Sequence, residues 1–215
     1  MKKSSLIVSN ILYSIVRPFL WLFLIITINP KIYHKKRIPK KTGFIFAGTH
    51  TSYYDSFLIG RTTLRPLHFL AKKELMDVKL LGPILKALGF IRVDRSKKNP
   101  RATELAVEYL KHNKIVCLFP EGTINKGDDY ILPFKHGAVS FAYKSGKPIV
   151  PFAFVGGPKL FNYHVKVLLG EPYFVNSDDF EKETKILEKK VIELIKEGRS
   201  IDGKKSNSPK NKKRK

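Results

Sequence analysis

The stretch that decides the fold is Gly43-Phe-Ile-Phe-Ala-Gly-Thr-His-Thr-Ser-Tyr-Tyr-Asp55, a short apolar run followed by polar residues. Residues 44–47 are continuously apolar, which is typical of a strand covered on both faces. The polar residues after Gly48 cannot extend that core, so we predict a strand that ends in a loop. His50 and Asp55 then lie at the carboxyl end of the strand, where open α/β sheets bind ligands.

The spacing of His50 and Asp55 indicates what the pair can do. On one regular helix, side chains five residues apart lie about 140° apart around the axis and do not meet. If His50 precedes a helix and Asp55 lies in its first turn, the carboxylate can contact an imidazole nitrogen. That contact fixes the tautomer and leaves the other nitrogen as a general base for a hydroxyl group. The simpler alternative is that His50 is a polar loop residue and Asp55 a helix cap.

Length and composition favour one folded, strongly basic domain. The chain has 215 residues, and 41 Lys and Arg against 18 Asp and Glu give a formal charge of +23. This excess predicts a polyanionic partner, either nucleic acid or an anionic membrane surface. A hydrophobic content of 43% argues for a packed core. The single cysteine, Cys117, excludes an intramolecular disulfide and a cysteine-cluster metal site.

The first 30 residues differ from the rest, and we expect residues 1–30 to form a membrane anchor. The dense apolar part, residues 18–28, is too short to cross a bilayer of about 30 Å. The longer stretch 6–28 is interrupted by Arg17-Pro18. A helical hairpin that dips into one leaflet, a single tilted spanning helix and a buried helix all remain open. We expect a peripheral or monotopic protein at the cytoplasmic face of the cell membrane.

The remainder alternates strand and helix patterns, which predicts an α/β domain over residues 31–200. Pro151 suggests a bulge or an edge position for its strand, residues 163–169 read as a half-exposed strand, and Gly198 is expected to end the last helix. Residues 201–215 read as a disordered basic tail, because Lys204 to Lys215 include seven basic residues and no apolar one. We predict strands over residues 44–47, 67–71, 89–95, 114–119, 148–155 and 163–169, and helices over residues 56–60, 80–88, 100–109, 137–144 and 177–198.

Four polar or glycine-containing motifs follow one another in order within residues 44–155. They are Thr49-His-Thr-Ser-Tyr-Tyr-Asp55, Gly89-Phe-Ile-Arg-Val-Asp-Arg95, Phe119-Pro-Glu-Gly-Thr123 with Phe134-Lys-His-Gly137, and Ile149-Val-Pro151. Each motif is weak alone, but together they resemble those of the glycerolipid acyltransferases of the 1-acylglycerol-3-phosphate acyltransferase type. The resemblance implies an α/β fold with a central mixed sheet flanked by helices.

The resemblance also implies an activity. A fatty acyl group would pass from a thioester, on coenzyme A or acyl carrier protein, to the free hydroxyl of 1-acylglycerol-3-phosphate, giving phosphatidic acid. His50 would remove the hydroxyl proton and Asp55 would orient the imidazole. The chemistry requires no metal and no cofactor besides the acyl donor as co-substrate, and Cys117 would be structural.

Substrate-binding residues follow from the second and third motifs of the family. Arg95 is expected to grip the acceptor phosphate, with Lys135 as a second cation. Glu121, Gly122 and Thr123 are expected to line the acceptor site. The alternative for Arg95 and Lys135 is that both are ordinary solvated charges in a basic protein.

Two positions depart from the family pattern. Thr49 stands where the family usually has Asn, and Ile124 stands where it usually has Arg. Loss of that arginine leaves the acceptor open: Lys126 could replace it, or the acceptor could be another lysophospholipid or a glycerol compound. A non-catalytic basic protein that binds a membrane or nucleic acid is a further alternative, although the apolar anchor argues against nucleic acid.

The expected membrane contact suits the expected chemistry. Both substrates carry long acyl chains, so the active site must lie against a bilayer. Basic residues near an anionic leaflet contribute about 1 kcal/mol each, which gives the charge excess and the basic tail a use. For the tail, solvated disorder without a binding role remains the alternative. The predicted partners are therefore lysophosphatidic acid, the acyl donor and an anionic membrane surface.

Overall fold

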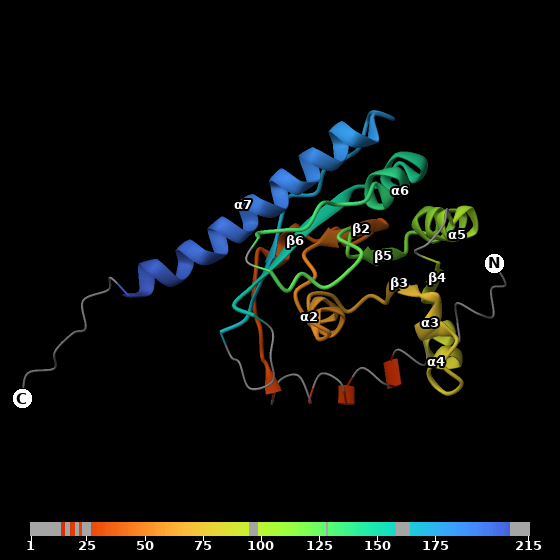
Figure 1. Ribbon diagram of the computed structural model, residues 1–215, viewed down its shortest axis with the longest axis horizontal. Helices are drawn as coiled ribbons and strands as arrows, with labels where there is room; N and C mark the ends of the chain where they lie inside the picture. Colours follow the sequence, from red (N-terminus) through yellow and green to blue (C-terminus); the bar gives the residue numbers. More distant parts are fainter. Residues whose placement is uncertain are drawn as a thin grey trace, which may run out of the picture.

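A seven-stranded mixed sheet forms the centre of the protein (Figure 1). The computed structural model describes residues 14–15, 18–19, 22, 27–94, 99–127, 129–157 and 164–206. The strands are β1 (Lys31–Tyr33), β2 (Phe44–Gly48), β3 (Leu67–Lys72), β4 (Ile91–Val93), β5 (Ile115–Leu118), β6 (Ile149–Val155) and β7 (Lys166–Leu169). The helices are η1 (Lys35–Arg37), α2 (Asp55–Gly60), α3 (Lys73–Met76), α4 (Leu81–Ala87), α5 (Pro100–Lys111), α6 (Gly137–Ser145) and α7 (Phe180–Ser206).

The strand order β1-β7-β6-β2-β5-β3-β4 places β2 at the centre of the sheet. In β2, Ile45 lies opposite Val116 of β5 and Ile149 of β6, and both pairings are parallel. Only β6 and β7 pair antiparallel among the described strands. The predicted α/β fold with a central mixed sheet is therefore confirmed.

Both faces of the sheet are covered by helices (Figure 1). Ile45 and Ala47 of β2 belong to a core cluster shared with α5, α6 and α7, whereas Phe44 and Phe46 belong to the cluster on the other face, shared with α2. All four side chains are fully buried. This double burial explains why the strand is a continuous apolar run instead of an alternating one.

The expectation of an edge position at Pro151 is wrong, whereas the alternative of a bulge fits the pairing opposite Pro151: Ile149 faces Tyr173 and Phe152 faces Leu169, so the facing segment holds one extra residue. β6 is paired on both sides, and its register with β2 runs without a break from Ile149 to Phe152. Proline has no backbone N–H to donate. The carbonyl oxygen of Pro151 still accepts a hydrogen bond from the N–H of Gly170. The paired residues of β6 and β7 begin only at Phe152, so Pro151 lies just before the part of β6 that pairs with β7.

The expected half exposure of the 163–169 strand is also wrong. β7 is buried over its whole length, including Lys166, which is 3% exposed. Its ammonium group donates a 2.6 Å hydrogen bond to the carbonyl oxygen of Gly198 in α7. A lysine within a strand pattern indicates an exposed position unless another group accepts hydrogen bonds from its ammonium group. Here that group is 32 residues away in sequence, so the strand pattern alone does not reveal it.

Helix α7 does not end at Gly198 as predicted but continues to Ser206. A Cβ atom at position 198 would lie 2.7 Å from the Val155 side chain and 2.8 Å from that of Leu168. Glycine at this position therefore lets the helix lie close against β6 and β7. Lys204 and Lys205, which were expected to belong to the tail, are helical. Residues 207–215 lie outside the described part of the chain, so the predicted tail stays a prediction there.

The predicted membrane anchor falls mostly outside the described residues. Ile15, Phe19 and Leu22 are described, and each exposes more than half of its surface. Within the part of the chain that the structure covers, no helix combines the length and the apolar character needed to span a bilayer. Two short elements that follow the segment, β1 and η1, were not predicted from sequence.

Candidate active site

His50 and Asp55 are in contact at the carboxyl end of β2. The imidazole Nδ1 of His50 lies 3.0 Å from Oδ2 of Asp55, which opens α2. The same oxygen accepts hydrogen bonds from the backbone N–H groups of Thr51, at 2.6 Å, and Ser52, at 2.8 Å. The predicted contact is confirmed, and the carboxylate also satisfies the loop that precedes α2. This carboxylate oxygen acts as an acceptor toward both backbone groups, so we assign the proton of this contact to Nδ1 of His50, which donates a third hydrogen bond to it.

The ring of His50 is held by an aromatic residue as well as by Asp55. It stacks on Phe119, which follows β5, with centroids 4.1 Å apart and ring planes 12° from parallel. The His50 side chain is 15% exposed, whereas the Asp55 side chain is fully buried. With Nδ1 bound to Asp55, Nε2 is the ring nitrogen that can take a proton from a ligand.

Glu121 connects the loop after β5 to the loop after β2. Its Oε1 accepts a 2.8 Å hydrogen bond from the backbone N–H of His50, and its Oε2 accepts one of 2.9 Å from Leu132. The backbone N–H of Asn125 donates in turn to the carbonyl oxygen of His50, at 2.7 Å. Burial raises the pKa of the Glu121 carboxyl, and the two backbone donors oppose that rise. These contacts fix the backbone at His50 from two sides.

The residues just before His50 hold β2 against β6. The hydroxyl of Thr49 accepts a 2.9 Å hydrogen bond from the backbone N–H of Phe154, and Thr49 is 1% exposed. A Cβ atom at Gly48 would lie 1.9 Å from the carbonyl oxygen of Phe152. Only glycine permits this approach. The start of the loop that carries His50 is therefore held in place against β6.

The His50 side chain lines a cavity of about 640 Å³, called here the active-site cavity. Aromatic residues line part of it, two lysines line it elsewhere, and Thr123 and Ile124 of the third motif also contribute. The lining includes Phe69, Phe90, Phe119, Tyr53, Leu75, Val78, Lys72 and Lys126. A general base beside an apolar wall, with two lysines against one carboxylate, Glu74, suits an amphipathic, negatively charged ligand.

The Acyltransferase family model matches residues 29–155, a range that contains β1 to β6 and the whole of the site described above. The chain belongs to the Acyltransferase family. The family predicted from the motifs is thereby confirmed.

Proteins named 1-acyl-sn-glycerol-3-phosphate acyltransferase are among the relatives of the chain. One from Bacillus subtilis is 36% identical over 147 residues, which cover 66% of this chain and 72% of that protein. One from Borreliella burgdorferi is 33% identical over 118 residues, which cover 54% of this chain and 47% of that protein. The chain thus spans nearly three quarters of the first relative and about half of the second.

A solved structure has a similar fold. The crystal structure of the 1-acyl-sn-glycerophosphate (LPA) acyltransferase PlsC from Thermotoga maritima matches with a TM-score of 0.69 and 26% identity. The match covers 92% of this chain and 83% of that one. The shared fold therefore extends beyond the range of the family model.

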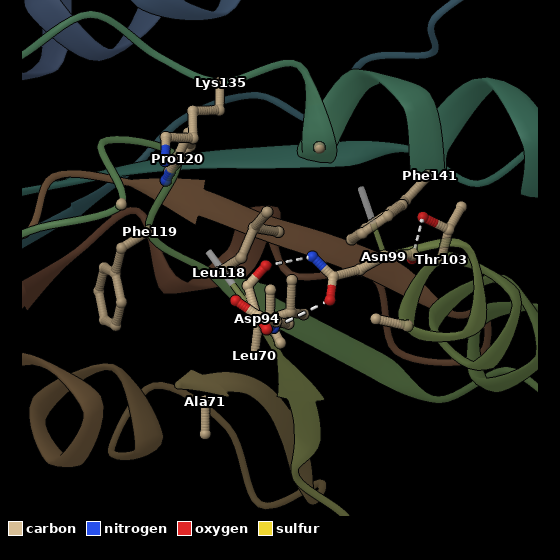
Figure 2. A pocket seen from close by; sticks show the side chains of 14 residues that line it. Leu70, Ala71, Asp94, Asn99, Thr103, Leu118, Phe119, Pro120, Lys135 and Phe141 are labelled. Atoms are coloured by element: carbon tan, nitrogen blue, oxygen red, sulfur yellow. Dashed lines mark hydrogen bonds between the residues drawn. The ribbon is translucent and has the colours of Figure 1, made fainter. Parts of the chain in front are cut away.

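The residues predicted to bind substrate do not all lie in one cavity of this acyltransferase. Thr123 lines the active-site cavity, but Gly122 and Lys135 line a second cavity of about 260 Å³, called here the rear cavity. Figure 2 shows Lys135 beside Pro120 in the rear cavity, with Asp94 and Asn99 joined by hydrogen bonds. Leu70, Ala71 and Phe119 line both cavities.

The remaining predicted residues have different positions. Arg95 lies outside the described residues, so its predicted phosphate contact stays a prediction. Glu121 is 5% exposed and uses both carboxylate oxygens on backbone N–H groups. Its predicted contact with the acceptor also stays a prediction, while the geometry favours a role in positioning His50.

Lys72 and the stacking role of Phe119 were not predicted from the sequence. Lys72 is the last residue of β3 and lines the active-site cavity. The signal was available, because a cation directly after a predicted strand lies at the same edge of a parallel sheet as His50. The stacking of Phe119 on His50 had no comparable signal, since it depends on β2 and β5 being neighbours.

Proposed function

We propose that the protein transfers a fatty acyl group from an acyl thioester to the free hydroxyl of 1-acylglycerol-3-phosphate, giving phosphatidic acid for phospholipid synthesis. The observation that carries this proposal is the His50–Asp55 pair, which lines a cavity with apolar and cationic walls in a chain of the Acyltransferase family. The names of the relatives support the acceptor, and the resemblance of the motifs supports the roles of the two residues.

The reaction needs one base and proceeds by direct attack. Nε2 of His50 takes the hydroxyl proton while the oxygen bonds to the thioester carbonyl carbon, and Asp55 stabilises the imidazolium that forms. The tetrahedral intermediate then breaks its carbon–sulfur bond. The thiolate leaves and receives the proton from His50, so the histidine returns to its starting state. No nucleophilic side chain is required, and Cys117 is fully buried within β5.

The acceptor phosphate binds to Lys72 and Lys126, which line the active-site cavity together with His50. Lys126 is two residues beyond Ile124, and Ile124 lines the same cavity. Lys126 therefore supplies the charge that position 124 lacks. Because a lysine ammonium is a less specific phosphate ligand than a guanidinium, acylation of another lysophospholipid is the second candidate function, and Ile124 is the observation that favours it.

The substrates place this reaction at a membrane. The partners are lysophosphatidic acid, an acyl donor carried on coenzyme A or acyl carrier protein, and an anionic membrane surface at the cytoplasmic face. The exposed apolar residues Ile15, Phe19 and Leu22 and the formal charge of +23 support this location.

The test is an assay of purified full-length protein with 1-acylglycerol-3-phosphate and a long-chain acyl thioester, on coenzyme A and on acyl carrier protein in separate reactions. We expect phosphatidic acid, detected by mass spectrometry, and at least a thousandfold loss of turnover in His50→Ala. Equal turnover by wild type and His50→Ala contradicts the proposal. A panel of lysolipids with choline, ethanolamine and glycerol headgroups separates the two candidate acceptors, because a higher kcat/KM for any of them selects the second function.

A further inference from the structure

Four large apolar side chains are exposed together on α3, α4 and the turn between them. Leu75 is 43% exposed, Val78 47%, Leu80 82% and Ile84 48%. We call this set the α3–α4 ridge. Grouped exposed apolar residues commonly mark an interaction site, whereas single ones are ordinary.

The stretch that forms the ridge also carries exposed positive charge. Lys72, Lys79 and Lys86 are exposed within or next to it in sequence. Among the acidic neighbours, Asp77 is paired with Arg92 at 2.7 Å, while Glu74 is exposed. Exposed apolar side chains interspersed with lysines match the boundary between headgroups and acyl chains of an anionic leaflet.

The ridge is also continuous with the active-site cavity. Leu75 and Val78 both line that cavity, together with His50, and both are exposed, so they form part of its rim. In Figure 1 the described N-terminal residues lie along the same side of the molecule as α2, α3 and α4. Ile15 and Phe19 of this N-terminal part are likewise exposed.

We propose that the α3–α4 ridge inserts into the surface of an anionic bilayer, where it joins the active-site cavity to the leaflet that supplies the lysolipid. The inference rests on the proposed function and deepens it, because it assigns the route by which the acceptor reaches His50. The combination of basic and apolar side chains favours a lipid surface as the partner of the ridge. A second copy of the chain and the chain's own N-terminal segment are the competing occupants.

Fluorescence tests the insertion without any reliance on catalysis. Leu80→Cys is labelled with the environment-sensitive dye NBD, and Phe174→Cys, which replaces a side chain that is 59% exposed in the segment between β7 and α7, serves as the matched control. Cys117 is fully buried and does not compete for label in the folded protein. We expect vesicles of phosphatidylcholine and phosphatidylglycerol to raise emission at position 80 at least twofold, with quenching by nitroxide lipids and no change at position 174.

Two results overturn the proposal. Emission at position 80 that is already high without vesicles, and does not respond to them, means that the chain itself covers the ridge or, where sedimentation shows a dimer, that a second copy does. Low emission that stays low when wild-type protein floats with the vesicles means that the ridge faces water at the membrane.

Enzyme kinetics tests whether the ridge helps the acceptor to reach the active site from the bilayer. The double variant Leu80→Ser and Ile84→Ser is assayed with long-chain acceptor in anionic vesicles and with a short-chain acceptor dissolved below its critical micelle concentration. We expect turnover in vesicles to fall at least about tenfold, because two apolar anchors are lost, and turnover of the dissolved acceptor to stay within about twofold of wild type. Phe174→Ser is expected to change neither.

The two assays distinguish the failures. Equal rates of the double variant and wild type in vesicles overturn the docking inference and leave the proposed function intact. Absence of product from the dissolved acceptor in wild type counts against the proposed function, while the fluorescence result still decides whether the ridge inserts.

Discussion

The backbone N–H of His50 donates a 2.8 Å hydrogen bond to Oε1 of Glu121, so the loops that follow β2 and β5 are fixed to each other. The second oxygen of Glu121 holds Leu132. The Glu121 carboxylate thus fixes the backbone of His50, the proposed base, relative to Phe119, on which the His50 ring stacks.

Glu121→Gln tests this positioning role. The amide keeps one acceptor oxygen but turns an NH2 group toward one of the two backbone donors, which is left without a partner. We expect kcat to fall about tenfold to a hundredfold, because small displacements at a catalytic base are costly, and acceptor KM to change less than about twofold. The free energy of unfolding falls by about 1 to 3 kcal/mol.

Glu188→Ala is the control for Glu121→Gln. Glu188 accepts a 2.7 Å hydrogen bond from the backbone N–H of Phe134, so its alanine variant removes the acceptor of one backbone donor outside the active-site cavity. It should lose stability and keep kcat. A raised acceptor KM at unchanged kcat in Glu121→Gln would instead support the direct acceptor contact predicted from the sequence.

Asp55→Asn tests the proposed support of His50. The amide cannot stabilise an imidazolium as a carboxylate does, so we expect kcat to fall by about 10² to 10⁴ with folding retained by circular dichroism. Because Asp55 acts through His50, the double variant Asp55→Asn with His50→Ala should be no slower than His50→Ala alone. If the double variant is slower than His50→Ala by the same factor by which Asp55→Asn is slower than wild type, the two residues act independently, which contradicts a role of Asp55 through His50.

Lys126→Ala tests the site of the acceptor phosphate. Removing a charge-assisted contact should raise the KM for lysophosphatidic acid about tenfold to a hundredfold, and should leave kinetics with monoacylglycerol, which has no phosphate, unchanged. Lys135→Ala is the matched control, because Lys135 lines the rear cavity. If Lys135→Ala raises KM and Lys126→Ala does not, the phosphate lies in the rear cavity.

Thr49→Val tests the connection between β2 and β6. Valine has the shape of threonine but leaves the N–H of Phe154 without its acceptor, so unfolding by urea should show a loss of about 1 to 3 kcal/mol. Thr49→Ser keeps the hydroxyl and should lose less than about 1 kcal/mol. Equal losses in the two variants contradict the importance of this hydrogen bond.

His68 predicts a dependence of stability on pH. It is 1% exposed, stacks on Tyr109 and contacts the carbonyl oxygen of Gly89 through Nδ1; burial lowers its pKa to about 4. The unfolded chain binds a proton near pH 6.5 and the folded one only near pH 4, so acidification between these values favours unfolding. The expected loss at this site is about 3 kcal/mol.

Comparison of His68→Gln with wild type isolates this contribution, since the carboxyl groups titrate in both proteins. Glutamine can still donate to Gly89 but does not titrate. Urea unfolding measured from pH 7 to pH 4 should show a shallower decline for the variant, and parallel curves contradict the assignment.

The parts of the fold and site that could be predicted depend on local signals. A continuous apolar run that breaks at a glycine predicts a buried strand with a loop at its end, and the contact between His50 and Asp55 follows from their position around the start of a helix. Both features are formed within residues 43–55. The family resemblance rests on four such local motifs in order.

The features that could not be predicted depend on distant partners. The burial of Lys166 requires the carbonyl of Gly198, and the interior position of β6 requires β7 beside it. Likewise, Lys126 and Lys135 both follow β5 in sequence, yet Lys126 lines the active-site cavity and Lys135 the rear cavity. Sequence spacing carries no information on which of two neighbouring cavities a loop side chain will line.

The pairing of β1 with β7 has a consequence for the order of assembly during synthesis. Lys31 lies opposite Lys166, so the strand nearest the N-terminal apolar segment completes its hydrogen bonds only with a strand translated more than 130 residues later. Contacts of such long range form late in folding. While the ribosome is still translating the middle of the chain, β1 has no partner strand, and the N-terminal segment before it is available to a bilayer. We therefore expect nascent chains to reach the membrane before the sheet closes.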